Sequence, residues 1–294
     1  MDRMLVSVVI VNYNCGELLT VCVRSVLAST VPVQVFVSDN GSTDESITLL
    51  ERDFQGDSRV NIHKNGENIG FSSANNRTIS KTSGEYILFL NPDCLVNPDT
   101  IERMIAQMKV NPDCGMSGCL VRNPDATEQA GCRRRVPTPW RILVRTFYLD
   151  KLFPDHPRFQ NFALSLEPLP DKPIEVEAIS GAFMLVRRAA IEEVGLFDEG
   201  YFLHCEDLDW CMRFRQKGWR VLFVPDVEAV HDKGSCSHDT PIRVEWHKHK
   251  GMVRFYRKFF RHQYPWPFMW PVIIAVWARF AAMAVMHSFR KIDS

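Results

Sequence analysis

The first 121 residues alternate between short apolar runs and longer segments in which apolar positions recur every three or four residues. The apolar runs cover Leu5–Val11, Val33–Val37, Val60–His63, Tyr86–Leu90 and Met116–Val121, and we interpret them as buried strands. The segments between them predict helices at Glu17–Ala28, Asp44–Asp53, Ser72–Lys81 and Pro98–Lys109. Strands that alternate with helices are typical of an α/β fold, with a mainly parallel sheet and helices on both faces.

The rest of the chain divides into an irregular part, a second regular part and a C-terminal extension. Residues 122–178 lack a regular period and include a proline-rich stretch, which predicts a long excursion from the core. Strand-like runs at residues 178–188 and 219–225 flank a predicted helix at residues 206–217. We therefore expect an α/β domain over residues 1–238 and a helical extension over residues 239–294.

Polar side chains cluster where four successive predicted strands end. The clusters are Asn12-Tyr13-Asn14, Ser38–Asp44, Asn65–Asn76 and Asn91-Pro92-Asp93. Ligands of parallel sheets bind beyond the carboxyl ends of the strands, so the clusters predict one shared cleft.

Two of these clusters allow both a functional and a purely structural interpretation. Asp39 would accept hydrogen bonds from a nucleobase or a ribose, or it would only belong to a turn in which Ser42 or Thr43 caps the next helix. The loop before the third helix would present free N–H groups to an anion, or it would form an ordinary cap with Ser72.

The triplet Asn-Pro-Asp occurs four times within 35 residues. Asn97-Pro98-Asp99 suits a helix start, with Asn97 as the cap and Pro98 at the first helical position. Asn111-Pro112-Asp113 suits a helix end, and Asn123-Pro124-Asp125 suits a turn. Asn91-Pro92-Asp93 instead ends a strand at the predicted cleft. There Asp93 is a candidate ligand for a hard divalent cation that bridges two phosphates.

A second group of acids opens the predicted helix after residue 205. Glu206, Asp207 and Asp209 lie within four residues. Each alone suits the first turn of a helix, but three like charges so close repel one another. A general base that removes a proton from an acceptor hydroxyl would explain their presence. His231 ends a further strand-like run and is either structural or a metal ligand.

The composition is that of a folded protein without a net charge. The chain has 294 residues, of which 46% are apolar and 24% charged, and Lys plus Arg equals Asp plus Glu at 35 each. The nine cysteines include no CxxC pair, which predicts reduced, mostly buried thiols in a cytosolic setting. The N-terminal apolar run is too short for a signal peptide, and we interpret it as the first strand.

Seven segments together resemble the family 2 glycosyltransferases of the GT-A fold, in particular the rhamnosyltransferase-like branch. They are VSVVIVNYN, VSDNGSTD, NGENIGFSSANN, YILFLNPD, ISGAFMLVRR, FDEGYFLHCEDLDWCMRFRQKGW and VEAVHDKGSCS, in the order of the family. The resemblance implies an inverting sugar transfer from a nucleotide-diphospho-sugar, with rhamnose from dTDP-rhamnose as the first choice. The acceptor would be a hydroxyl of a lipid-linked saccharide in cell-envelope polysaccharide synthesis.

The resemblance also implies roles for individual residues. Asp207 matches the catalytic base, and Glu206 precedes it in the same motif. Asp93 matches the last acid of the DxD motif and, with His231, would bind Mg2+ or Mn2+ on the diphosphate. Asp39 would hold the base of the nucleotide, and the nucleotide-sugar pocket as a whole would comprise Asn12, Asn14, Asp39, Asn68, Gly70, Asn75 and Asn91.

Asn91 stands where the family's motif has its first acid, which reduces the charge offered to a metal. Two other functions stay open. A nucleotidyltransferase also uses a nucleotide cleft and a carboxylate-bound metal, but it would need a glycine-rich basic loop where this chain has Asn12-Tyr13-Asn14. The second is a GT-A scaffold without activity, which only Asn91 supports. Against it counts the presence of Asp39, Asp93, Asp207 and His231.

The C-terminal extension predicts contact with a membrane surface. Residues 243–262 carry seven Lys or Arg against one acid, and Phe268–Phe289 is apolar and long enough for a spanning helix. Because Pro271, Arg279 and His287 interrupt a clean span, we expect a cytoplasmic protein whose extension lies on the anionic inner face of the cell membrane. A spanning helix, or one packed on the domain or on a second copy in a homo-oligomer, is the alternative.

Membrane attachment would bring the enzyme to a polyprenyl-diphosphate-linked saccharide acceptor. The run Arg133-Arg134-Arg135 would meet that diphosphate, or it would be a solvated charge cluster. No nucleic-acid recognition motif accompanies the basic stretch, so we expect no nucleic-acid partner.

Overall fold

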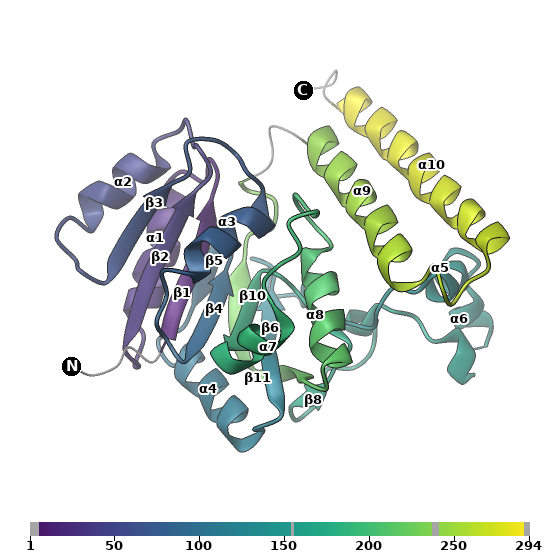
Figure 1. Ribbon diagram of the computed structural model, residues 1–294, viewed down its shortest axis with the longest axis horizontal. Coiled ribbons are helices and arrows are strands. Elements are labelled where there is room, and N and C mark those ends of the chain that lie inside the picture. Colours follow the sequence, from purple (N-terminus) through teal and green to yellow (C-terminus); the bar gives the residue numbers. More distant parts are fainter. Residues whose placement is uncertain (1–5, 154–155, 237–240, 291–294) are drawn as a thin grey trace.

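A nine-stranded sheet forms the centre of the structure (Figure 1). The computed structural model describes residues 6–153, 156–236 and 241–290, so the expected strand residue Leu5 lies outside the described part. The strand order is β3-β2-β1-β4-β10-β6-β11-β5, and β8 pairs with β11 outside this path. The strands are β1 Val6–Asn12, β2 Val33–Asp39, β3 Val60–Lys64, β4 Tyr86–Leu90, β5 Cys94–Val96, β6 Cys114–Arg122, β8 Ile174–Glu175, β10 Phe183–Arg187 and β11 Arg220–His231.

The strand directions confirm a mainly parallel sheet. β1, β2, β3 and β4 are mutually parallel, and β6 and β11 run in the same direction as they do. β10 is antiparallel to both β4 and β6, while β5 and β8 are antiparallel to β11. The carboxyl ends of β1, β2, β4 and β11 therefore lie at one edge of the sheet, as the polar clusters predict.

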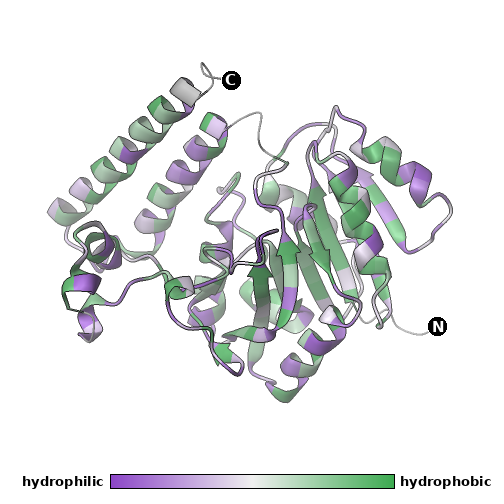
Figure 2. Ribbon diagram, turned by 180° about the vertical axis from the view of Figure 1, so that it is seen from behind, coloured by the Kyte–Doolittle hydropathy of each residue, from purple (hydrophilic) through white to green (hydrophobic). Residues whose placement is uncertain are grey.

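Helices cover both faces of the sheet (Figures 1 and 2). They are α1 Glu17–Leu27, α2 Ser46–Asp53, α3 Phe71–Ile79, α4 Thr100–Val110, α7 Arg188–Val194 and α8 Glu206–Gln216. In α1 the buried side chains include Leu19, Cys22, Val23 and Val26, which recur every three or four residues. The apolar period read from the sequence is thus the face that packs on the sheet.

Three expected helix caps are wrong. Ser42 does not cap α2, because its hydroxyl donates to Asp39 Oδ1 at 2.5 Å, and Thr43 provides no cap either. Asp44 takes that role in part, since its carboxylate accepts the Ser46 N–H at 3.2 Å. Ser72 lies inside α3, which is preceded by Gly70 with a positive φ of 86°.

The helix α4 begins at Thr100, later than the triplet Asn97-Pro98-Asp99 suggests. Its flanking residue is Asp99, so Asn97 is not the cap and Pro98 is not the first helical residue. Asn111 does close this helix and donates from Nδ2 to the carbonyl of Gln107 at 2.9 Å. Asn123-Pro124-Asp125 forms the expected turn, in which Asp125 Oδ1 accepts the Thr127 N–H at 3.0 Å.

The excursion at residues 122–178 contains short elements that the sequence does not predict. They are β7 Arg133–Arg134, α5 Pro139–Thr146, α6 Leu149–Leu152 and the 3-10 turns η1 Pro157–Phe159 and η2 Leu164–Leu166. β7 pairs with β9 Ala178–Ile179 in a separate two-stranded sheet. Arg133 is buried and bonded to Glu128 at 2.9 Å, so it is neither a phosphate ligand nor part of a solvated cluster.

The C-terminal extension forms two antiparallel helices, α9 Pro241–Phe259 and α10 Trp266–Arg290 (Figure 1). α9 packs on the α/β domain through the buried residues Phe255 and Tyr256. α10 packs on α9, where the Trp246 ring lies 5.0 Å from that of Trp277. Pro267–Ser288 is long and apolar enough to cross a membrane, and only 6% of its most apolar stretch is buried.

The prediction of nine reduced thiols is wrong for two cysteines. Cys15 and Cys236 form a disulfide that joins the loop after β1 to the loop after β11. Their separation of 221 positions leaves no local pattern for sequence reasoning to use. The other seven cysteines are free and buried, as expected.

Candidate active site

A cavity of about 710 Å³ lies at the carboxyl edge of the sheet and contains most of the chemistry expected from the sequence. Its walls come from the ends of β1, β4 and β11, the loop at residues 202–205, the excursion and α9. The predicted site residues that line it are Asn68, Gly70, Asn91, Asp93, Glu206, Asp207 and His231. Asn12, Asn14, Asp39 and Asn75 are not among its lining residues.

Asn12 and Asp39 form a buried pair beneath the cavity. They lie opposite each other at the ends of β1 and β2, and Asn12 Nδ2 donates to Asp39 Oδ1 at 2.9 Å. Asp39 Oδ2 also accepts the backbone N–H of Ser42 at 3.2 Å. The carboxylate thus fixes the loop after β2, and the neighbouring Asn40 lines the cavity in its place.

Asn14, Asn75 and Asn68, which also belong to the expected nucleotide pocket, all form hydrogen bonds within the fold, and of the three only Asn68 lines the cavity. Asn14 Oδ1 accepts the N–H of Thr43 at 2.8 Å, and Asn75 Nδ2 donates to the carbonyl of Phe71 at 2.9 Å. Both side chains therefore hold backbone in place. Asn68, which lines the cavity, accepts the Gly70 N–H at 3.1 Å and so shapes the start of α3.

Asp93 and His231 meet because β5 pairs antiparallel with β11. The pairing places His231 opposite Cys94, so the Oδ1 atom of Asp93 lies 3.1 Å from His231 Nε2. His231 Nδ1 lies 2.6 Å from Gln129 Oε1, which can only accept, so Nδ1 carries the proton and Nε2 offers a lone pair. Asn91 Nδ2 donates to that Nε2 at 3.2 Å.

This arrangement fits a divalent cation. Asp93 Oδ1 is buried and receives no hydrogen bond, and it faces a second electron-pair donor in His231 Nε2. Histidine ligands commonly donate their other N–H to an oxygen, as His231 does to Gln129. Cys94 is the third residue of this cluster, but its thiol donates to the Ala182 carbonyl at 3.4 Å, so Asp93 and His231 are the candidate ligands.

Asp207 lies at the start of α8, where its carboxylate is held by two separate elements. Arg134 on β7 donates from Nη2 to Asp207 Oδ2 in an ion pair. The backbone N–H of Gly181 reaches the same oxygen at 3.2 Å, and the Leu208 N–H reaches Oδ1 at 2.7 Å. The carboxylate is thus oriented on the cavity wall before any substrate binds.

Glu206 differs from its neighbour although both line the cavity. It is only 6% exposed, and its burial together with the charge of Asp207 raises the pKa of Glu206 to about 8. Glu206 is therefore mostly protonated at neutral pH. Of the two residues expected to be catalytic, Asp207 is ion-paired with Arg134 on the cavity wall, whereas Glu206 is neutral.

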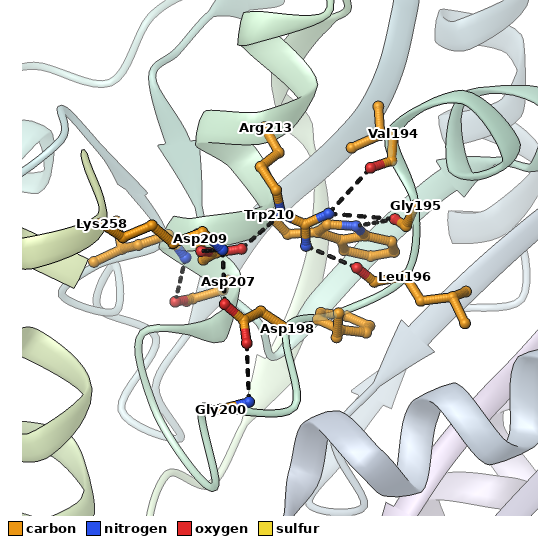
Figure 3. A network of polar contacts seen from close by, with 12 residues as sticks. Val194, Gly195, Leu196, Asp198, Gly200, Asp207, Asp209, Trp210, Arg213 and Lys258 are labelled. Carbon is orange, nitrogen blue, oxygen red and sulfur yellow. Dashed lines mark hydrogen bonds and ion pairs between the residues drawn. The ribbon is translucent and has the colours of Figure 1, made fainter. Parts of the chain in front are cut away.

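Asp209, the third acid of this group, is explained by structure alone. Its buried carboxylate contacts Arg213 Nε at 2.7 Å and Lys258 Nζ of α9 at 2.5 Å (Figure 3). Lys258 also contacts Asp198 at 2.7 Å. The acids at the start of α8 thus divide into one oriented carboxylate, one neutral carboxyl and one ion pair that fastens α9 to the domain.

Two groups of cavity residues escape the sequence reasoning. Gln129, which fixes the His231 tautomer, lies in the irregular excursion and carries no motif. From α9 come Arg243, His247 and Lys248, which the basic pattern of the extension associates with a membrane instead. The residues are visible in the sequence, but their position over the cavity depends on packing between distant elements.

Comparison with known proteins identifies the family. The model for "Glycosyl transferase family 2" matches residues 7–195, which is more than half of the chain. The chain belongs to glycosyl transferase family 2. This family and the relatives described next confirm the expected glycosyltransferase enzyme.

Relatives that match over most of their length agree with this family. The glycosyltransferase is 31% identical to the N-acetylglucosaminyl-diphospho-decaprenol L-rhamnosyltransferase of Mycobacterium tuberculosis over 261 residues, which cover 84% of this chain and 82% of the relative. It is 25% identical to the rhamnosyltransferase WbbL of Escherichia coli (strain K12), over 77% of this chain and 83% of the relative.

A solved structure confirms the fold. The mannosyltransferase PcManGT of Pyrobaculum calidifontis, solved in complex with GDP-Man and Mn2+, superposes with a TM-score of 0.62 at 18% identity. The superposition covers 95% of this chain and 70% of that protein. The glycosyltransferase therefore has the GT-A architecture, and the match extends beyond the residues covered by the family model.

Proposed function

We propose that this glycosyltransferase moves rhamnose from dTDP-rhamnose to a hydroxyl of a polyprenyl-diphosphate-linked saccharide in cell-envelope polysaccharide synthesis. The observation that carries the proposal is one cavity lined both by the Asp93–His231 pair and by the oriented carboxylate of Asp207. The names of the Mycobacterium tuberculosis and Escherichia coli relatives support the choice of sugar. The first of those names also supports the diphosphate-linked acceptor.

The residues divide the reaction between two sides of the cavity. Asp207 takes the proton of the acceptor hydroxyl as that oxygen attacks the anomeric carbon. Arg134 and the Gly181 N–H hold the carboxylate in place for this transfer. Attack from the side opposite the leaving nucleoside diphosphate inverts the anomeric configuration.

Asp93 and His231 would hold a Mg2+ or Mn2+ ion at the other side. Such an ion neutralises the charge that develops on the leaving diphosphate. Asn91, an uncharged side chain that contacts His231, stands in place of an acid, so these residues would hold the cation with one negative charge fewer than a site with two acids. The buried oxygen of Asp93 that lacks a hydrogen bond supports a cation at this place.

The cytoplasmic face of the cell membrane is the proposed location. The α10 positions Ile274, Ala278, Ala281 and Val285 recur at helical spacing, and all four are exposed and apolar. Lys250, Arg257 and Arg261 add exposed positive charge near α9. An apolar helix face next to basic residues suits an anionic bilayer surface, and we propose that residues 239–294 serve this attachment while residues 1–238 hold the donor and the base.

A thermal-shift panel of nucleotide sugars, each with and without Mn2+, tests the proposal. dTDP-rhamnose with Mn2+ is expected to raise the Tm more than UDP- or GDP-sugars do, because a ligand that binds only the folded chain stabilises it. A panel in which no nucleotide sugar shifts the Tm would contradict the transferase. A nucleotidyltransferase would respond to a nucleoside triphosphate instead, and an inactive scaffold would bind the donor without turnover.

A further inference from the structure

One wall of the cavity is cationic, and neither the proposed base nor the metal side uses it. Lys233 follows β11, while Arg243 and Lys248 come from α9, and all three line the cavity. Lys248 pairs with Glu245 at 2.9 Å. Among the described residues, Lys233 and Arg243 have no acidic partner. The wall therefore carries positive charge for which the folded chain supplies no counter-charge.

The nearby acids do not neutralise this wall. Asp207 is paired with Arg134, and Glu206 is mostly protonated at neutral pH because its pKa is about 8. The Nε atom of Arg134 is buried and finds no acceptor. A buried guanidinium N–H without an acceptor, next to two cations without counter-ions, raises the free energy of the folded state unless an anion binds in the cavity.

Aromatic packing fixes the wall in position. The rings of Phe202 and His247 stack with their centroids 4.2 Å apart, and the Arg243 guanidinium lies 5.8 Å from the Phe202 ring. The backbone of Gly251 on α9 approaches the same loop so closely that a Cβ there would lie 2.8 Å from the carbonyl oxygen of His204. α9 and the loop at residues 202–205 are thus packed as one surface.

The wall also adjoins the apolar helix α10. Because the two helices are antiparallel (Figure 1), the first half of α9, which carries Arg243 and Lys248, lies beside the second half of α10. The ring contacts of Trp246 and His249 with Phe280 mark this contact. A ligand with a charged head and an apolar chain would therefore reach the wall and the exposed apolar face of α10 together.

We infer that Arg243 and Lys248, together with Lys233, form a second anion site that binds the diphosphate of the lipid-linked acceptor. The inference rests on the proposed function in that it takes the acceptor to be such a lipid. The other diphosphate in the reaction belongs to the donor, which binds on the side of Asp93 and His231. Whether the site binds the acceptor diphosphate or the donor diphosphate is tested by removing the metal and by measuring the KM of each substrate separately.

Direct binding provides the first test. The full-length protein is titrated calorimetrically with geranyl diphosphate in EDTA, which removes the cation that the donor side requires. We expect binding by the wild type and about ten- to a hundredfold weaker binding by Arg243→Gln/Lys248→Gln, because charge-assisted hydrogen bonds are lost. The control Lys109→Gln, which changes an exposed lysine at the end of α4, should bind like the wild type. Absence of wild-type binding, or equal loss in the control, overturns the inference.

Kinetics provide the second test. The double variant should raise the KM for a diphosphate-linked acceptor about tenfold or more and leave the KM for the sugar nucleotide within about twofold. With an alkyl glycoside of the same saccharide, which lacks phosphate, both proteins should perform alike. A raised donor KM with an unchanged acceptor KM would assign the site to the donor. Failure to transfer sugar despite diphosphate binding would refute the proposed function and leave the site intact.

Discussion

Asp207 and Glu206 are neighbours in sequence, but their surroundings give them different chemistry. Asp207 is a carboxylate held by Arg134 and the Gly181 N–H. We predict that Asp207→Asn lowers kcat about a hundred- to ten-thousandfold, the range of general base catalysis. Donor binding should be unchanged, as measured by isothermal titration with dTDP-rhamnose. A variant that keeps more than a tenth of the wild-type kcat would show that Asp207 is not the base.

Glu206 provides a pH-dependent prediction. The folded chain keeps its proton up to about pH 8, whereas the unfolded chain releases it near pH ~4.3. Stability therefore falls as the pH rises through this window, because the folded state binds more protons than the unfolded state. Glu206→Gln removes the penalty and should raise the Tm by roughly 3–10 °C at pH 9, with little change at pH 4. Differential scanning calorimetry gives the Tm of the wild type and the variant at each pH. Equal Tm differences between the two proteins at pH 4 and pH 9 would contradict the raised pKa of Glu206.

Asn91 is uncharged and stands where a second acid would add charge to the proposed metal site, which leads to a prediction about metal affinity. Asp93→Ala should abolish both turnover and the Mn2+-dependent rise in Tm, because Asp93 and His231 are the proposed ligands. Asn91→Asp should keep activity and bind Mn2+ about tenfold more tightly, since a second carboxylate adds charge at the site. Mn2+ titration by calorimetry gives both affinities. Weaker binding by Asn91→Asp would show that the Asn91 amide, through its bond to His231, matters more than charge.

At the scale of elements, α9 belongs to the active site as much as to the extension. Its Arg254 and Lys258 contact Asp198 at 2.8 and 2.7 Å, and hydrogen bonds from both lower the pKa of Asp198 to about 2, against the effect of its burial. The charge pairing is thus present above about pH 4 and is lost as the pH falls toward 2. α9 in turn packs on the loop of His204 and Cys205, two residues with positive φ that place α8 at the cavity.

The helix α10 is proposed to attach the protein to the membrane. A variant that changes only its exposed face tests this role and leaves the fold in place. Ile274→Asp/Val285→Asp changes two side chains that are 59% and 54% exposed, so the fold should be retained. We predict at least about a tenfold loss of co-sedimentation with vesicles that contain phosphatidylglycerol, because the apolar face no longer enters the interface. Val110→Asp, which alters an apolar residue on α4 that is 73% exposed, is the control. Unchanged vesicle binding by the double variant would exclude this face as the attachment surface.

At the scale of the whole molecule, the sequence predicts what local pattern encodes. Buried strands such as Tyr86–Leu90 and the amphipathic α1 follow from apolar period, and the parallel sheet follows from their alternation. The cavity follows because parallel strands bring their polar ends to one edge. That reasoning places Asp93 and His231 at the cavity wall, and the group of acids that opens α8 brings Asp207 there as well.

The remaining features depend on contacts between distant segments. Asp39 looks like a ligand at a strand end, but its partner Asn12 comes from the adjacent strand and its carboxylate is bonded within the fold. Gln129 and Arg134 reach the site from an excursion without a regular period. The Cys15–Cys236 disulfide and the position of α9 over the cavity likewise require the packed structure, because no short-range signal specifies either of them.

Mass spectrometry of the lipid product tests whether this cavity transfers a deoxyhexose with Asp207 as the base. The wild-type protein, dTDP-rhamnose, Mn2+ and an N-acetylglucosaminyl-diphospho-polyprenol are incubated beside the same mixture with Asp207→Asn. We predict an acceptor heavier by one deoxyhexose for the wild type alone, with the anomeric configuration opposite to that of the donor. An unmodified acceptor with the wild type would exclude this transfer, and the same product from both proteins would exclude Asp207 as its base.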